Sequence, residues 1–60
     1  MPVVVVEMWE GRTIEQKRGL AEGITGEFVK IGVPQEHVHI IFKESPKSSW
    51  SIGGKLASDK

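Results

Sequence analysis

Residues 2–20 read PVVVVEMWEGRTIEQKRGL and place a strand, a turn and the start of a helix in succession. The β-branched run after Pro2 shows no polar alternation, which is typical of a strand covered on both faces. Pro2 has no backbone N–H to donate, and this is tolerated at the first position of a strand. The sequence Glu-Gly-Arg at 10–12 ends the run. We therefore predict a first strand over residues 2–8.

A capping box marks the start of the helix. Thr13 supplies a hydroxyl at the N-cap, and Gln16 supplies a side-chain amide three residues later. Gly32, followed by Val33-Pro34, is a stop signal. The residues between them predict a helix from about Ile14 to Ile31. Its apolar stripe recurs at helical spacing and consists of Leu20, Ala21, Ile24, Phe28 and Ile31.

Three glycines, Gly19, Gly23 and Gly26, share one face of this helix, away from the apolar stripe. Each destabilises a helix by about 1 kcal/mol relative to alanine. Two readings stay open. Either the flat face lets another backbone approach closely, such as a helix of a neighbouring subunit, or a strongly capped helix tolerates the glycines.

A second strand is predicted over residues 37–43, HVHIIFK. Strand, helix and strand in this order form a βαβ unit, whose strands run parallel with a right-handed crossover. Residues 45–49 are expected to turn, and residues 50–56 to form a short extended tail or hairpin. We expect residues 1–60 to form a single domain. Two strands and one helix leave one sheet face and both edges bare, so this unit requires partners.

Composition supports self-association. A chain of 60 residues folding alone hides only about 60% of its unfolded surface. The sequence has no cysteine, which excludes disulfides and zinc–thiolate sites. Eight basic and eight acidic side chains are scattered and cancel, so no footprint for nucleic acid is present. No apolar run is long enough to span a membrane or to serve as a signal peptide. We expect a soluble, cytoplasmic homo-oligomer.

Three motifs in order resemble the 4-oxalocrotonate tautomerase family over nearly the whole chain. They are Met1-Pro2, the run Glu10-Gly11-Arg12-Thr13-x-Glu15-Gln16-Lys17, and Trp50-x-Ile52-Gly53-Gly54-x-Leu56. Each motif alone is only weakly specific for the family. All three together, in this order and at these spacings, are strongly specific for it. The resemblance implies an α/β (α+β) tautomerase β-α-β fold with a short C-terminal hairpin. It also implies that two subunits join into a four-stranded sheet and that three such dimers form a hexamer, with a dimer as the smaller alternative.

The resemblance further implies a site for a small-molecule carboxylate substrate, with no cofactor and no metal. Pro2 stands at the position of the amino-terminal proline that acts as the base once Met1 is removed. Arg12 stands at the position of a carboxylate-binding arginine, and Trp50 at an aromatic position that lines the site. His39 stands where dicarboxylate-specific members carry a second arginine. This departure favours monocarboxylate substrates.

The chemistry of Pro2 fits this role. Proton transfer between carbons of an unsaturated acid needs a base that is neutral near pH 7. Apolar surroundings disfavour the charged form of an amine and lower its pKa. We expect Val3, Ile52, Trp50 and Trp9 to supply such surroundings, and Arg12 to act in the same direction. Read alone, Pro2 is a common residue after an initiator methionine, and only the other motifs favour catalysis.

The other candidates also have ordinary explanations. Arg12 alone reads as a solvated charge, although its guanidinium can grip a carboxylate with two parallel hydrogen bonds. His37 and His39, two apart on a predicted strand, share a face, but no third metal ligand is suggested. His39 is either a surface residue or a donor in a neighbour's site.

The sequence thus predicts an enzyme, a cofactor-independent tautomerase acting on enol or keto acids. Two alternatives remain. One is a non-catalytic oligomeric binding module with the same fold. The other is a hydratase or dehalogenase acting on unsaturated acids, which requires an additional carboxylate near the tail that Ile52 and its neighbours do not offer.

Overall fold

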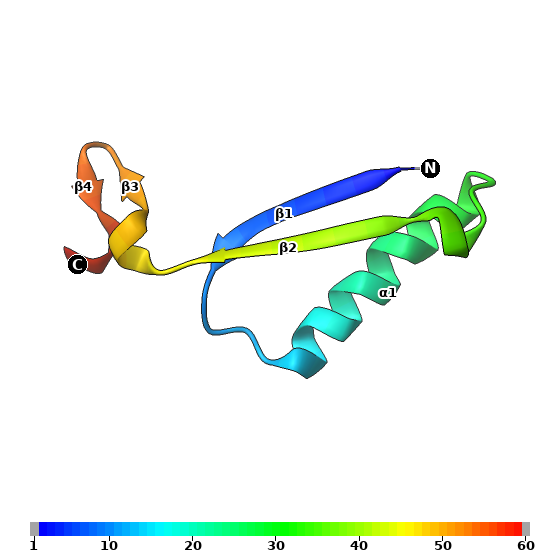
Figure 1. The fold of residues 1–60 in the computed structure, drawn as a ribbon, viewed down its shortest axis with the longest axis horizontal. Helices are drawn as coiled ribbons and strands as arrows, with labels where there is room; N and C mark the ends of the chain where they lie inside the picture. The colour runs from blue at the N-terminus through cyan, green and yellow to red at the C-terminus, as the bar shows by residue number, and fades with distance from the viewer. Residues whose placement is uncertain (1, 60) are drawn as a thin grey trace.

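Two long strands lie side by side in parallel, and a helix connects them (Figure 1). The computed structural model describes residues 2–59, so the predicted removal of Met1 lies outside the described residues. Strand β1 spans Val3–Trp9, helix α1 spans Ile14–Lys30, and strand β2 spans His39–Ser45. The register pairs Val3 with His39 at one end and Trp9 with Ser45 at the other. The predicted β-α-β unit is confirmed.

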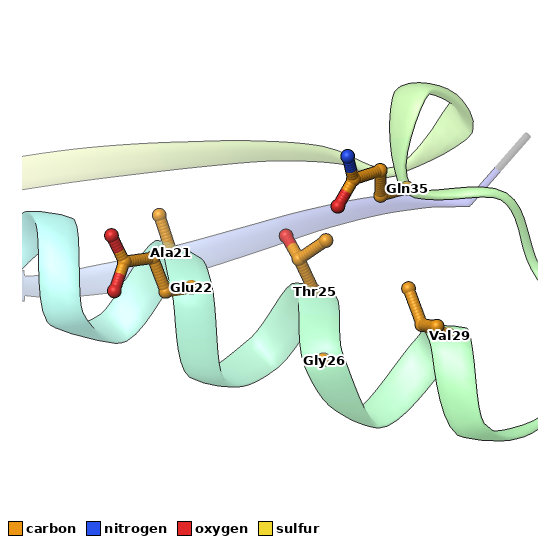
Figure 2. Close-up of a pocket in the computed structure, with 6 residues that line it drawn as sticks. All are labelled: Ala21, Glu22, Thr25, Gly26, Val29 and Gln35. Atoms are coloured by element: carbon orange, nitrogen blue, oxygen red, sulfur yellow. The ribbon is translucent and has the colours of Figure 1, made fainter.

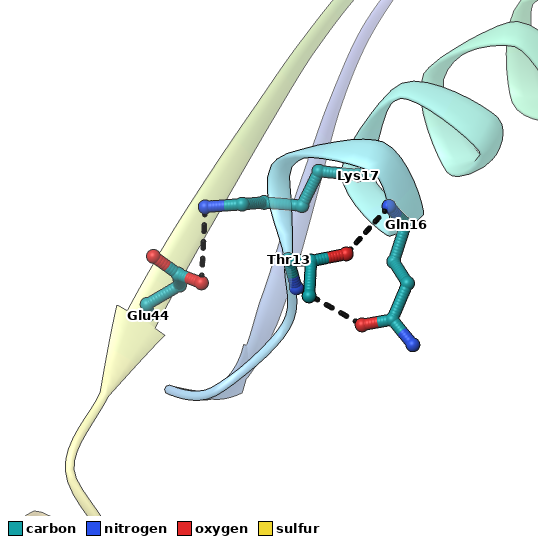
Figure 3. A network of polar contacts seen from close by, with 4 residues as sticks. All are labelled: Thr13, Gln16, Lys17 and Glu44. Carbon is teal, nitrogen blue, oxygen red and sulfur yellow. Dashed lines mark hydrogen bonds and ion pairs between the residues drawn. The ribbon is translucent and has the colours of Figure 1, made fainter.

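The start of α1 is fixed by the predicted capping box. The Thr13 hydroxyl accepts a hydrogen bond from the Gln16 N–H at 3.1 Å, and the Thr13 N–H donates to Gln16 Oε1 at 2.9 Å (Figure 3). Lys17 on the next position reaches across to Glu44 on β2, with 3.2 Å between Nζ and Oε2. The cap fixes the first turn of the helix, and the ion pair links that turn to the end of β2.

The helix ends where Gly32 adopts a φ of +96°, a conformation that favours glycine. The second strand begins two residues later than predicted, which corrects the sequence-based boundary. Residues Gln35–His37 form a 3₁₀ turn (η1) after Pro34, in which the His37 N–H donates to the Pro34 carbonyl at 2.9 Å. His37 therefore precedes the strand, and the inference that His37 and His39 share one strand face is wrong.

Only one face of the sheet is covered. Met8 is paired in register with Glu44, whose carboxylate meets Lys17 of α1, so this side of the sheet faces the helix. Val4, Val6, Ile40 and Phe42 lie on the same side and are half-buried. On the opposite side Val3, Val5 and Ile41 remain 51%, 46% and 47% exposed. The apolar run of β1 is thus covered on both faces only if another chain packs against it.

The predicted apolar stripe of α1 is covered only in part. Ala21, Ile24 and Phe28 are half-buried. Leu20 is 41% exposed, and Ile31, which follows the last helical residue, is 74% exposed. The glycine face is also open, since a Cβ at Gly19, Gly23 or Gly26 would meet nothing within 4 Å.

The C-terminal segment forms the predicted hairpin, with β3 at Ser51–Ile52 and β4 at Lys55–Leu56. Gly53 and Gly54 take φ values of +61° and +86°, as a tight two-residue turn with positive φ at both positions requires. The 3₁₀ turns Lys47–Ser49 (η2) and Ala57–Asp59 (η3) flank the hairpin. Figure 1 shows the hairpin beyond the carboxyl ends of β1 and β2, away from the helix.

The folded chain is elongated rather than spherical. Its extents are 43 × 23 × 13 Å, and its radius of gyration is 14.6 Å, where a compact chain of this length has about 10 Å. Among residues 2–59, Ala57 is the one buried hydrophobic residue. No helix in this part of the chain has the length and apolar character needed to cross a membrane. So little burial cannot offset the entropy of ordering the chain, which indicates further packing against other subunits.

Candidate functional site

Pro2 and His39 lie together at one end of the sheet. The His39 N–H donates to the Pro2 carbonyl oxygen at 3.0 Å, and Val3 is paired in register with His39. Pro2 is half-buried, whereas His39 is exposed. The parallel ladder therefore fixes the backbone of Pro2 beside that of His39, whose side chain lies on the same face of the sheet as Val3.

Arg12 lies at the opposite end, where β1 has finished and α1 has not begun. Gly11 precedes it with a φ of +120°, a backbone conformation that other residues rarely adopt. Arg12 lines a cavity of about 260 Å³ together with Met8, Trp9, Glu10, Gly11 and Lys47. This cavity is the feature of the described chain that best fits the predicted carboxylate-binding role.

Two indole rings meet beside this cavity. Trp9 and Trp50 pack edge to face, with ring centroids 5.6 Å apart and planes at 74°. The Lys47 ammonium lies 5.0 Å from the centroid of the Trp9 ring. Trp50 is anchored by its backbone, because its N–H donates to the Lys47 carbonyl and its carbonyl accepts from Ala57. Trp50 is thus connected to the Arg12 cavity indirectly, because it packs on Trp9, which lines that cavity.

The four predicted site residues form two pairs rather than one cluster. Pro2 and His39 stand where β1 begins, and Arg12 and Trp50 stand beyond its end. Seven extended residues separate the pairs by about 20 Å. Within one chain Trp9, Trp50 and Ile52 therefore do not surround Pro2, and the expected apolar surroundings would have to come from another chain. Because the two pairs are this far apart within one chain, a single site that contains all four residues needs two chains.

Arg12 also lines a hollow of about 560 Å³, together with Gln16, Gly19 and Leu20 of α1. A hollow of about 440 Å³ runs along α1 beside the 3₁₀ turn at 35–37, and Figure 2 shows the side chains that line it. They are Ala21, Glu22, Thr25, Gly26, Val29 and Gln35. None is a predicted site residue. Among residues 2–59, no three histidine or carboxylate side chains gather as metal ligands would.

Sequence reasoning missed the cavity role of Trp9 and Lys47. The signal for Trp9 was available, since it stands three residues before Arg12 and is one of two tryptophans in the chain. Lys47 is 35 positions from Arg12 in the sequence, and no sequence pattern indicated that it lies at the same cavity. Its place depends on the register that puts Ser45 beside Trp9 and on the 3₁₀ turn Lys47–Ser49 that follows Pro46.

Comparisons with known proteins agree over the whole chain. The profile of a family described as "Tautomerase enzyme" matches residues 2–60. A protein of Bacillus cereus named "Probable tautomerase" is 44% identical over 61 aligned residues, which cover 100% of both chains.

Solved structures give the same result. A 4-oxalocrotonate tautomerase homologue is similar with a TM-score of 0.92 at 39% identity, over 100% of this chain and 97% of that one. A heterohexamer 4-oxalocrotonate tautomerase from Chloroflexus aurantiacus is similar with a TM-score of 0.88 at 32% identity, over 98% and 97% of the two chains.

Proposed function

This chain belongs to the tautomerase family, and we propose that it is a cofactor-independent isomerase. Its substrate is an unsaturated 2-hydroxy or 2-oxo acid, and the reaction moves one proton between the enol and keto forms. The observation that carries the proposal is the cavity at the end of β1, which Arg12 and Trp9 both line and where Trp50 packs on Trp9.

Pro2 is the general base in this proposal. After Met1 is removed, its secondary amine takes the proton from the enol hydroxyl, and the electrons of the broken O–H bond form the C=O bond. The electrons of the enol C–C double bond then form the new C–H bond with the proton that the amine returns. Two features support the role. The ring fixes the direction of the amine, and the His39 N–H holds the carbonyl of the same residue at 3.0 Å. A base fixed in this way can face the same carbon in every turnover.

Arg12 binds the substrate carboxylate in this proposal. A guanidinium can donate two parallel hydrogen bonds to one carboxylate, which gives both affinity and orientation. Trp50, packed on Trp9, supplies an apolar wall for the unsaturated part of the substrate. His39 sits beside Pro2 and donates from its ring to the substrate oxygen, in place of a permanent cation.

The working site is shared between subunits. The separation of about 20 Å between Pro2 and Arg12 is supporting evidence, because a small acid cannot span it. We infer a homo-oligomer in which Pro2 and His39 of one chain meet Arg12 and Trp50 of another. Edge pairing of two chains into a four-stranded sheet, followed by assembly of three dimers into a hexamer, would cover the bare sheet face. The heterohexameric relative supports this size.

Replacing Pro2 with Ala tests the base. The variant keeps an amino terminus but loses the ring that directs the amine, and kcat/KM for an enol acid should fall by at least ~10²-fold. The matched control is Pro34→Ala, which changes a proline at the start of a surface turn and should leave kcat/KM unchanged. Equal activity of the Pro2 variant and the parent would exclude this mechanism.

A further inference from the structure

The cavity at the end of β1 carries two cations. Arg12 and Lys47 both line it, with Glu10 as the one carboxylate in the lining. The three ion pairs among residues 2–59 join Lys17 to Glu44, Arg18 to Glu15 and Lys30 to Glu27, so neither cavity cation takes part in them. Two cations against one carboxylate give the lining an excess positive charge, which favours an anionic ligand.

Lys47 lies against an aromatic ring at this cavity. Its ammonium lies 5.0 Å from the centroid of the Trp9 ring, within the range of a cation–π contact. Its carbonyl accepts the Trp50 N–H at 3.2 Å, so the turn that places the lysine also places the second indole. The cavity is therefore built from two segments far apart in the sequence, one carrying Trp9 and Arg12 and the other carrying Lys47 and Trp50.

We infer that Lys47 is a second carboxylate-binding residue, acting with Arg12, and that Trp9 and Trp50 form the wall for the ligand's planar tail. The inference rests on the proposed function and extends it. Arg12 donates two directed hydrogen bonds to one carboxylate, and Lys47 adds a point charge to the same group. The indole faces and edges favour an aromatic or conjugated tail. The ligand class is thus a monocarboxylic acid with a flat apolar tail.

Binding can be measured without turnover, because both tryptophans of the chain lie beside this cavity. The assembled protein is titrated with 3-phenylpropanoate, which has no enol form to isomerise, while tryptophan fluorescence is recorded. The neutral amide, 3-phenylpropanamide, is the matched ligand. Lys47→Met should weaken binding of the acid about 5-fold to 10-fold, the low end for a charge-assisted contact of an exposed lysine. It should leave binding of the amide unchanged, and Lys47→Arg should restore binding of the acid.

Lys30→Met is the control for net charge. It removes one cation from an exposed pair at the far end of α1, where 71% of the lysine side chain is exposed, and should not change either affinity. The inference is overturned if Lys47→Met binds the acid as tightly as the parent. It is also overturned if that variant loses affinity for acid and amide equally, because Lys47 would then only hold the turn in place.

The result separates this inference from the proposed function. A protein that shows the expected dependence on Lys47 but isomerises no enol acid would support the binding residue and refute the isomerase. A protein that isomerises enol acids while Lys47→Met binds the acid normally would refute the inference alone.

Discussion

Replacing Ile41 with Asp perturbs the bare face of the sheet at its centre. Ile41 is 47% exposed, and its neighbours on this face, Val3 and Val5, are 51% and 46% exposed. Full burial of such a side chain contributes ~1.5–3 kcal/mol of favourable free energy. Covering the exposed half of each side chain at an interface therefore contributes about 1 kcal/mol. The three residues together therefore contribute about 3 kcal/mol per chain to assembly.

The aspartate removes about a third of that contribution and adds the desolvation of a carboxylate, which amounts to several kcal/mol. At ~1.4 kcal/mol per factor of ten, the association constant should fall by at least ~10²-fold. Light scattering on a size-exclusion column at micromolar concentration should show a smaller particle than the parent. Because the site is shared between chains, kcat/KM should fall in parallel.

The same substitution at Ile14 is the control. Ile14 is 64% exposed at the first position of α1, where a carboxylate interacts favourably with the helix dipole. Its oligomer should keep the mass of the parent. An Ile41→Asp protein with the parent's mass and activity would refute the reasoning that the bare face is an interface.

Three further changes follow from the site and the helix cap. Thr13→Ala removes the hydroxyl that accepts the Gln16 N–H at 3.1 Å and should lower the free energy of unfolding by ~1 kcal/mol, seen as a lower melting temperature that Thr13→Ser does not share. His39→Arg should raise kcat/KM for a dicarboxylate ~10-fold relative to a monocarboxylate, and an unchanged ratio would mean that His39 does not face the substrate. Lowering the pH should reduce kcat/KM for a monocarboxylate, because a protonated Pro2 amine cannot accept a proton; a rate that rises with acidity would contradict this.

Local signals predicted most of the fold. The Thr13 hydroxyl and the Gln16 amide satisfy the first helical N–H groups, and this requirement is independent of the rest of the chain. Gly53 and Gly54 occupy the two positive-φ positions of a tight turn, a requirement that also depends only on the local backbone. The start of β2 was placed two residues early, because β-branched spacing cannot show that the backbone after Pro34 first closes a 3₁₀ turn.

The arrangement of the site could be predicted less well. The family resemblance suggested Pro2, Arg12, His39 and Trp50 one at a time but carried no information on which of them are neighbours. The parallel register supplies that information, pairing His39 with Val3 and carrying Arg12 to the far end. The approach of Lys47 to Trp9 depends on tertiary structure and has no sequence signature.

The free amine of Pro2 is the centre of the account, and one comparison tests it most directly. Two preparations are made that differ only in whether intact mass shows Met1 removed or retained, and both are assayed on the same enol acid. The processed form should isomerise it, and the form with Met1 should be at least ~10²-fold slower, because an amide nitrogen is not a base. Equal rates for the two forms would contradict the proposed mechanism.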